Sequence, residues 1–188
     1  MKKIQYNSPV ILSFAILSGL VLLLGMLTSG YTNSMFFSVY LSSWADPLTY
    51  PRLFLHVLGH SGFAHFTGNM LMILVLGPMV EERYGSKNTL ILILITALAT
   101  GLIHCFLSPS VHLLGASGIV FMLIFLASLS GASGKRIPLT LILVAILYFS
   151  QEIYAGISLS DNISQITHII GGCCGIVLGF IIRKKARE

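Results

Sequence analysis

The sequence has 188 residues, of which 55% are hydrophobic and 9% are charged, and its formal net charge is +5. Because soluble domains carry about 25% charged residues, this composition excludes a soluble globular protein and predicts an integral membrane protein. The basic residues flank apolar runs, so they are interpreted as topology signals and argue against nucleic acid binding. Three cysteines, two of them adjacent, argue against a disulfide framework.

Six apolar segments are predicted to be membrane-spanning helices, since about 20 helical residues cross a bilayer core of about 30 Å. The first, residues 8–28, is too long for the apolar part of a signal peptide and lacks a clear cleavage site, which disfavours that alternative. Residues 29–60 form a long aromatic-rich connection that suits a membrane interface. The remaining spans cover residues 63–80, 89–107, 117–130, 138–155 and 163–182. We therefore expect an all-α membrane protein, a six-transmembrane-helix bundle forming one domain over residues 1–188.

An even number of spans places both termini on the same side of the membrane. If that side is cytoplasmic, ten of the eleven Lys and Arg residues fall inside and only Arg52 falls outside, which agrees with the positive-inside rule. The ten are Lys2, Lys3, Arg83, Lys87, Lys135, Arg136, Arg183, Lys184, Lys185 and Arg187. The sequence therefore predicts a multi-pass protein of the cell membrane with both termini in the cytoplasm.

The fourth span is short. Residues 117–130 make a helix of about 20 Å, which cannot cross about 30 Å of hydrocarbon. Ser117 is therefore predicted to lie below the outer membrane surface, and the loop before it must dip into the protein. Non-helical backbone at this depth is tolerated only where it is buried or lines a wet cavity. We expect a water-filled pocket, open to the outside, with Ser117 at its floor.

Four polar residues from three spans are expected at one depth. Counted from the inner ends of their helices, Ser117 lies at about 20 Å, His168 at about 22 Å, His65 at about 24 Å and Asn69 at about 18 Å. Polar and ionisable residues inside a membrane are costly and are functional candidates by default. A packing role with hydrogen bonds remains the alternative for each residue taken singly.

This set of residues suits acyl transfer. Serine becomes a nucleophile when a base takes its proton, and His168 is the base on the sixth span. None of the six acidic residues is a credible third member, so the sequence predicts a Ser–His dyad. Phe121, one turn after Ser117, could stack on the imidazole. The backbone N–H of Ser117 and the side chains of His65 and Asn69 could stabilise an oxyanion.

Glycines predict a close contact between the fourth and sixth spans. Gly171, Gly175 and Gly179 recur every four residues after His168, and small residues at this spacing let helix backbones approach. Alone, this stripe indicates only packing. Following His168, it supports a contact that would bring the histidine to Ser117.

The combined motifs resemble the rhomboid intramembrane serine proteases over residues 8–183. They are His60-x4-His65-x3-Asn69, Gly115-x-Ser117-Gly118 and His168-x2-Gly171-x3-Gly175, with Glu81-x-Arg83-x-Gly85, Arg52 and His56 in supporting positions. The resemblance implies that Ser117 is the nucleophile, His168 the base, and His65 and Asn69 the oxyanion donors. It also implies transmembrane protein substrates cut near the extracytoplasmic side, a fifth helix that gates lateral entry, and no cofactor or metal. Two departures are Phe121, where tyrosine is common, and Pro51, where an aromatic residue is common.

Several alternatives remain open. A non-catalytic rhomboid-like protein would bind membrane clients, but such relatives lack the serine or the histidine, and this chain has both. A small transporter or channel would favour internal repeats, and none is evident. A zinc site from His56, His60 and His65 lacks the glutamate of the H-E-x-x-H motif. Ser133 lies in a second Gly-Ala-Ser-Gly tetrapeptide before Lys135, where a flexible cytoplasmic turn is expected.

Overall fold

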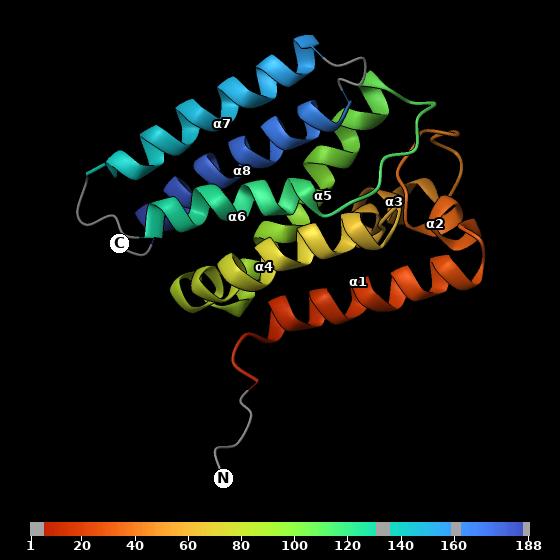
Figure 1. Ribbon diagram of the computed structural model, residues 1–188, viewed down its shortest axis with the longest axis horizontal. Helices are drawn as coiled ribbons and strands as arrows, with labels where there is room; N and C mark the ends of the chain where they lie inside the picture. Colours follow the sequence, from red (N-terminus) through yellow and green to blue (C-terminus); the bar gives the residue numbers. More distant parts are fainter. Residues whose placement is uncertain (1–5, 131–135, 159–162, 186–188) are drawn as a thin grey trace.

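The computed structural model describes residues 6–130, 136–158 and 163–185. Every secondary-structure element named within these ranges is a helix (Figure 1). Two residues, Val39 and Leu113, add one isolated antiparallel bridge. The helices are α1 (Pro9–Leu27), α2 (Tyr31–Phe36), α3 (Thr49–Leu55), the 3-10 helix η1 (His56–Leu58), α4 (Phe63–Tyr84), α5 (Ser86–Leu107), α6 (Ser117–Ser130), α7 (Leu139–Ser158) and α8 (Ile163–Lys185).

Each of the six predicted spans corresponds to one helix: α1, α4, α5, α6, α7 and α8. Four of these are long and apolar enough to cross a membrane by themselves, namely α1, α4, α5 and α8 over Gln165–Ile182. The expectation of a helical membrane bundle is confirmed, and α6 has 14 residues. The connection over residues 29–60 contains the short helices α2, α3 and η1, which the sequence analysis did not assign.

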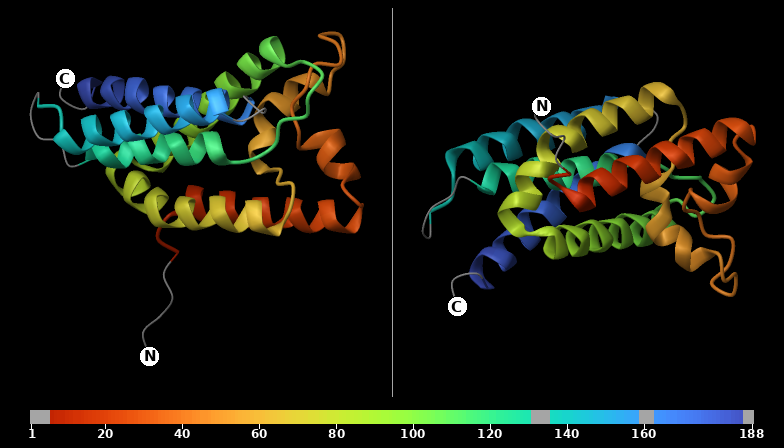
Figure 2. Two further views of the ribbon diagram at one scale, coloured as in Figure 1. Left: turned by 45° about the horizontal axis from the view of Figure 1, so that its top comes forward. Right: turned by 90° about the horizontal axis from the view of Figure 1, so that it is seen from below.

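The helix α6 lies at the centre of the bundle, between α4 on one side and α8 on the other (Figures 1 and 2). The helix α1 packs on α4, and α7 packs on α8 at the opposite edge. Apolar side chains surround α6, and Met122, Leu123, Phe125, Leu126 and Leu129 are fully buried. A helix that is apolar on all sides is stable only inside protein or lipid, which explains how a helix too short to span the bilayer is held within it.

The outer helices present apolar side chains outward. On α1, for example, Leu20, Leu23 and Leu27 are exposed, and on α5 Leu90 and Ile91 are exposed. Exposed apolar surface of this extent is unstable in water and is expected where a protein faces lipid. The pattern agrees with a multi-pass membrane protein.

Glu81 joins the start of α1 to the end of α4. Its buried carboxylate accepts hydrogen bonds from the backbone N–H groups of Val10 (3.1 Å) and Ile11 (3.0 Å), and from the Ser86 hydroxyl (2.7 Å). The first N–H groups of a helix have no partner within it, and Ser8 at the N-cap makes no side-chain cap. The carboxylate of Glu81 therefore caps α1 from 70 residues away.

The substitution Glu81→Ala is expected to destabilise the fold by about 3 kcal/mol, because two backbone donors and one hydroxyl lose a charged, buried acceptor. The free energy of unfolding is measured by denaturation in mixed detergent micelles. Glu82→Ala is the matched control, since the side chain of Glu82 is exposed on the same turn. Equal stability of the two variants would contradict the assigned cap.

Candidate active site

The backbone before α6 is held in a turn that only glycine adopts easily. Gly115 has a φ of +139°, and its N–H donates to the carbonyl of His56 (3.0 Å). Ala116 is fully buried, and Ser117 is the first residue of α6 with a half-buried side chain. The N–H of Ser117 therefore lies at a helix start, where it has no partner within the helix. This geometry agrees with the expected descent of the loop into the protein.

The helices α6 and α8 approach so closely that glycines are required between them. A Cβ atom on Gly171 would overlap the carbonyl oxygen of Gly118, and one on Gly175 would contact the backbone of Met122. The pairs 118/171 and 122/175 have the same register, so the helices run side by side in the same direction. Extended one turn upward, this register brings His168 level with the residues that begin α6.

An aromatic stack holds the imidazole of His168. Its ring lies parallel to that of Phe121, with centroids 4.2 Å apart and an interplanar angle of 11°. Tyr148 of α7 meets Phe121 edge-on at 4.1 Å. The sequence analysis expected the Phe121 contact but missed Tyr148, because an aromatic residue in an apolar span carries no signal of its partner.

The side chains from α4 reach the same place. A Cβ atom on Gly115 would come within 2.9 Å of the imidazole of His65, so this ring lies directly against the turn before Ser117. The Nδ1 atom of His65 is hydrogen-bonded to the Ser61 hydroxyl (3.1 Å). One turn later, Asn69 is buried, and its Nδ2 has no hydrogen-bond partner among the described residues. A buried donor left without an acceptor is rare in folded proteins, which marks Asn69 as a functional candidate.

His60 is buried and supports His65. Its Nδ1–H donates to the carbonyl of Leu58 (3.1 Å), and its ring contacts His65 edge-on with centroids 5.1 Å apart. In the described part of the chain, no group of three His, Cys, Asp or Glu side chains could hold a metal ion. The contacts of His60 therefore suit a supporting role for the ring of His65.

The connection between α1 and α4 is built on Arg52 and His56. Arg52 is buried; its guanidinium donates to the carbonyl of Met35 (2.8 Å) and pairs with Asp46 (3.0 Å). The ring of His56 lies between the carbonyl of Arg52 (3.2 Å) and the hydroxyl of Thr100 on α5 (3.3 Å). Because the carbonyl of His56 also accepts from Gly115, this connection positions the turn before Ser117.

His56 is expected to make the fold acid-sensitive. Burial lowers the pKa of His56 from 6.5 to about 4, so the unfolded chain binds this proton more readily between those values. The stabilisation from neutral His56 is present above pH 6.5 and is lost as the pH falls towards 4. The pH dependence of thermal melting in detergent gives the number of protons that the protein binds on unfolding. Between pH 4 and 6.5 this number should be smaller by about one in His56→Gln than in the wild type. The same proton uptake in both proteins would contradict this.

Variants of His60 and Asp46 test whether buried histidines cause the acid sensitivity of the fold. Burial also lowers the pKa of His60 to about 4, so His60→Gln should remove a comparable part of the acid sensitivity. The pKa of Asp46 is lowered from 3.8, chiefly by a hydrogen bond from the backbone of Leu48. Since the stabilisation from its carboxylate is lost progressively below about pH 5, Asp46→Asn should leave the slope between pH 5 and 6.5 unchanged.

A family model of the rhomboid domain matches residues 47–185. The chain belongs to the rhomboid family. The match covers α3 to α8, and therefore every helix that contributes a side chain to the candidate site.

Two named relatives are similar to most of this chain. The protein YdcA of Bacillus subtilis (strain 168), provisionally named a rhomboid protease, is 28% identical over 149 residues, which cover 73% of this chain and 70% of YdcA. The rhomboid protease GlpG of Enterobacter sp. (strain 638) is 31% identical over 144 residues, which cover 73% of this chain and 50% of GlpG. The chain thus spans about half the length of that second relative. This chain is therefore a rhomboid-family membrane protein that is related to named proteases.

Three residues considered in the sequence lie outside this geometry. Ser133, in the second tetrapeptide, falls outside the described residues, as does Asp161, one of the six acidic residues excluded as a third catalytic member. The side chain of Glu152, another of these six, is not described. The expectation that none of the three belongs to the site stays a prediction. The described parts of the site come from α4, α6, α7 and α8.

Proposed function

We propose that this rhomboid-family protein is an intramembrane serine endopeptidase that uses a dyad of Ser117 and His168. The observation that carries the proposal is the register of α6 and α8: Gly171 against Gly118 and Phe121 on His168 bring the histidine level with Ser117. Nucleophile and base must come within about 3 Å of each other for proton transfer. We expect residues 1–188 to form the single domain that contains this pair.

The reaction needs only these two side chains and water. The Oγ of Ser117 attacks the substrate carbonyl carbon as His168 takes its proton, and a tetrahedral oxyanion forms. The imidazolium of His168 then protonates the leaving amine, and the peptide bond breaks. Water, activated by neutral His168, attacks the resulting ester and releases the second product. Stacking on Phe121 helps to hold the imidazole in position.

The oxyanion would be stabilised by donors around Gly115. Three are available: the backbone N–H of Ser117 at the start of α6, the Nδ2 of Asn69, which no described residue hydrogen-bonds, and the Nε2 of His65. If the Ser61 hydroxyl donates to Nδ1 of His65, then Nε2 carries the proton and can donate. Donors already in place when charge develops make a large contribution to catalysis.

Asn69→Ala is expected to lower kcat by about 10²- to 10³-fold with little change in KM, because the lost donor acts mainly in the transition state. The measurement is the initial rate of cleavage of a transmembrane reporter over a range of reporter mole fractions in liposomes. Asn88→Ala, at the far end of the bundle, is the matched control. A large rise in KM with unchanged kcat would assign Asn69 to substrate binding instead.

The substrate would enter sideways between α4 and α7. A groove of about 670 Å³ separates these helices; Met72 and Leu76 line one wall, and Val144, Leu147 and Tyr148 line the other. Tyr148 also contacts Phe121, so the groove leads towards the candidate site. A transmembrane segment could reach Ser117 from the lipid along this path. With both termini cytoplasmic, cleavage would occur near the extracytoplasmic side.

Reconstitution tests the proposal directly. Purified full-length chain in liposomes should cleave a transmembrane reporter, and a fluorophosphonate should label the chain and stop the cleavage. A client-binding protein without catalysis is the second candidate, supported only by the groove between α4 and α7. Capture of the reporter without cleavage or labelling would favour that function and reject the protease.

A further inference from the structure

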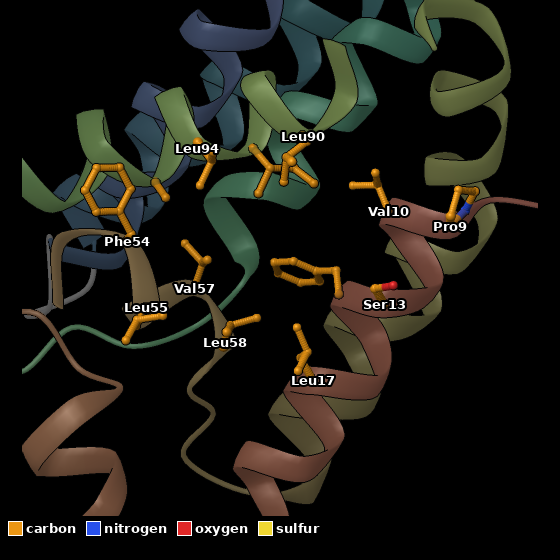
Figure 3. A pocket seen from close by; sticks show the side chains of 13 residues that line it. Pro9, Val10, Ser13, Leu17, Phe54, Leu55, Val57, Leu58, Leu90 and Leu94 are labelled. Carbon is orange, nitrogen blue, oxygen red and sulfur yellow. The ribbon is translucent and has the colours of Figure 1, made fainter. Parts of the chain in front are cut away.

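A second groove lies on the opposite side of the bundle, between α1, the segment α3–η1 and α5 (Figure 3). Its volume is about 450 Å³. Ser13 is the only polar residue among those that line the groove, and its hydroxyl is hydrogen-bonded to the hydroxyl of Tyr6 (2.9 Å). Phe14, Val57 and Ala97 form a buried floor, whereas the rims on α1 and α5 are exposed. This groove is separate from the candidate active site.

The location of the groove indicates what fills it. Two of its walls, α1 and α5, are long apolar helices of a membrane protein, so hydrocarbon surrounds the opening. Along α1 the groove runs from Pro9 to Leu17, about 12 Å. That length fits within one leaflet, which is about half of a 30 Å hydrocarbon core. Phe54, Leu55 and Leu58 close the end away from Pro9 (Figure 3). The space therefore suits a single acyl chain rather than a helix that crosses both leaflets.

The open end of the groove has the residues that recognise a lipid headgroup. Lys87 lies one turn before Leu90 and two turns before Leu94, so all three share one face of α5. Helical side chains lean towards the N-terminus of their helix, which directs the exposed ammonium group of Lys87 away from the hydrocarbon. The hydroxyl of Tyr6 is hydrogen-bonded to Ser13 and to the carbonyl of Pro9, so its aromatic ring lies at the same end of the groove. Tyrosine and lysine are typical of the headgroup region.

We propose that this groove binds one anionic phospholipid, with an acyl chain between α1 and α5 beneath α3–η1 and the phosphate at Lys87. The site lies at the basic end of the bundle, which the positive-inside rule assigns to the cytoplasmic leaflet. The bound chain supports the segment whose His56 carbonyl accepts from Gly115, so the lipid stabilises the turn before Ser117. The lipid site does not depend on the proteolytic function.

Photocrosslinking tests the site. Full-length protein is placed in phosphatidylcholine nanodiscs containing a phosphatidylglycerol with a diazirine on one acyl chain, and crosslinked peptides are identified by mass spectrometry. The expected result is enrichment of peptides from the groove walls. Leu94→Trp fills the groove and should reduce capture at least fivefold, whereas Ile91→Trp should not. The control is matched, since both side chains are 42% exposed on α5 and only Leu94 lines the groove.

Lys87→Gln should reduce the preference for phosphatidylglycerol over phosphatidylcholine about fivefold, the effect expected for one basic residue at a membrane surface. Arg83→Gln, at the same end of the bundle, should leave this preference unchanged. Leu17→Trp fills the groove from α1 and guards against a folding defect specific to the Leu94 variant. Equal capture in the wild type and both groove variants, uniform crosslinking over all outward faces, or a crosslink to a second copy of the chain in the groove would overturn the proposal.

Discussion

Replacing Ser117 with alanine is expected to reduce cleavage of a transmembrane reporter by about 10⁴- to 10⁶-fold and to abolish fluorophosphonate labelling. The hydroxyl of Ser117 is the only group of the protein that bonds to the substrate's carbonyl carbon in the proposed mechanism, so no other side chain replaces it. His168→Ala should cause a comparable loss, because serine without a base remains a weak nucleophile. The measurement is reporter cleavage in liposomes, with a thermal melt of each variant to show that it is folded.

The chain contains its own control for this experiment. Ser133 lies in an identical Gly-Ala-Ser-Gly tetrapeptide, so Ser133→Ala makes the same chemical change in the same local sequence. We expect full activity and full labelling in that variant. The double variant Ser117→Ala/His168→Ala should be no slower than either single variant, because the two residues act as a unit. Loss of cleavage in Ser133→Ala alone, or intact cleavage in Ser117→Ala, would reject the assigned nucleophile.

Gly171→Ala should damage both the fold and the reaction. A Cβ atom at this position would overlap the carbonyl oxygen of Gly118, and backbone on both sides leaves no flexible side chain to move aside. Overpacking of this kind costs about 1 to 3 kcal/mol or more. The two helices must separate, which draws His168 away from Ser117, and a misplacement of about 1 Å can lower the rate about 10²-fold. Melting and reporter cleavage measure the two effects.

Two other glycines make the test specific. Gly68 on α4 has no atom near its missing Cβ, so Gly68→Ala should leave cleavage intact and raise stability slightly, as alanine favours a helix. Gly179 meets only the side-chain ends of Leu126 and Leu129, which can shift, so Gly179→Ala should have a smaller effect than Gly171→Ala. If all three variants behaved alike, the close approach of α6 and α8 at Gly171 would not be what holds the site.

Local patterns were sufficient to predict the spans and the candidate residues. The length of an apolar run reports directly on a membrane helix, and the serine and glycines that bound residues 117–130 marked the short α6. The four-residue glycine spacing also predicted the contact of α6 with α8, because only glycine permits such an approach. Polar residues in an apolar background are conspicuous, which is how Ser117, His65, Asn69 and His168 were identified. Their catalytic roles stay proposals.

Contacts between distant segments that leave no repeated pattern in the sequence could not be predicted. The sequence analysis ended the second span at residue 80, before Glu81, yet α4 continues to Tyr84 and Glu81 is buried. The backbone donors that compensate its charge lie at the start of α1, and nothing in the local sequence announces them. Similarly, the hydrogen bond from Gly115 to His56 depends on how the chain between α1 and α4 folds back.

The cap on α1 has a consequence for biosynthesis. Because the first helix emerges long before Glu81 and Ser86 are translated, its N-terminal amides stay without their carboxylate until the loop after α4 leaves the ribosome. Nascent chains arrested before that loop should hold the first helix loosely and expose it to membrane quality-control proteases, and protection should arise abruptly once residue 86 has emerged. Assembly of the helix that begins the chain is thus completed by a residue from the far end of the second span.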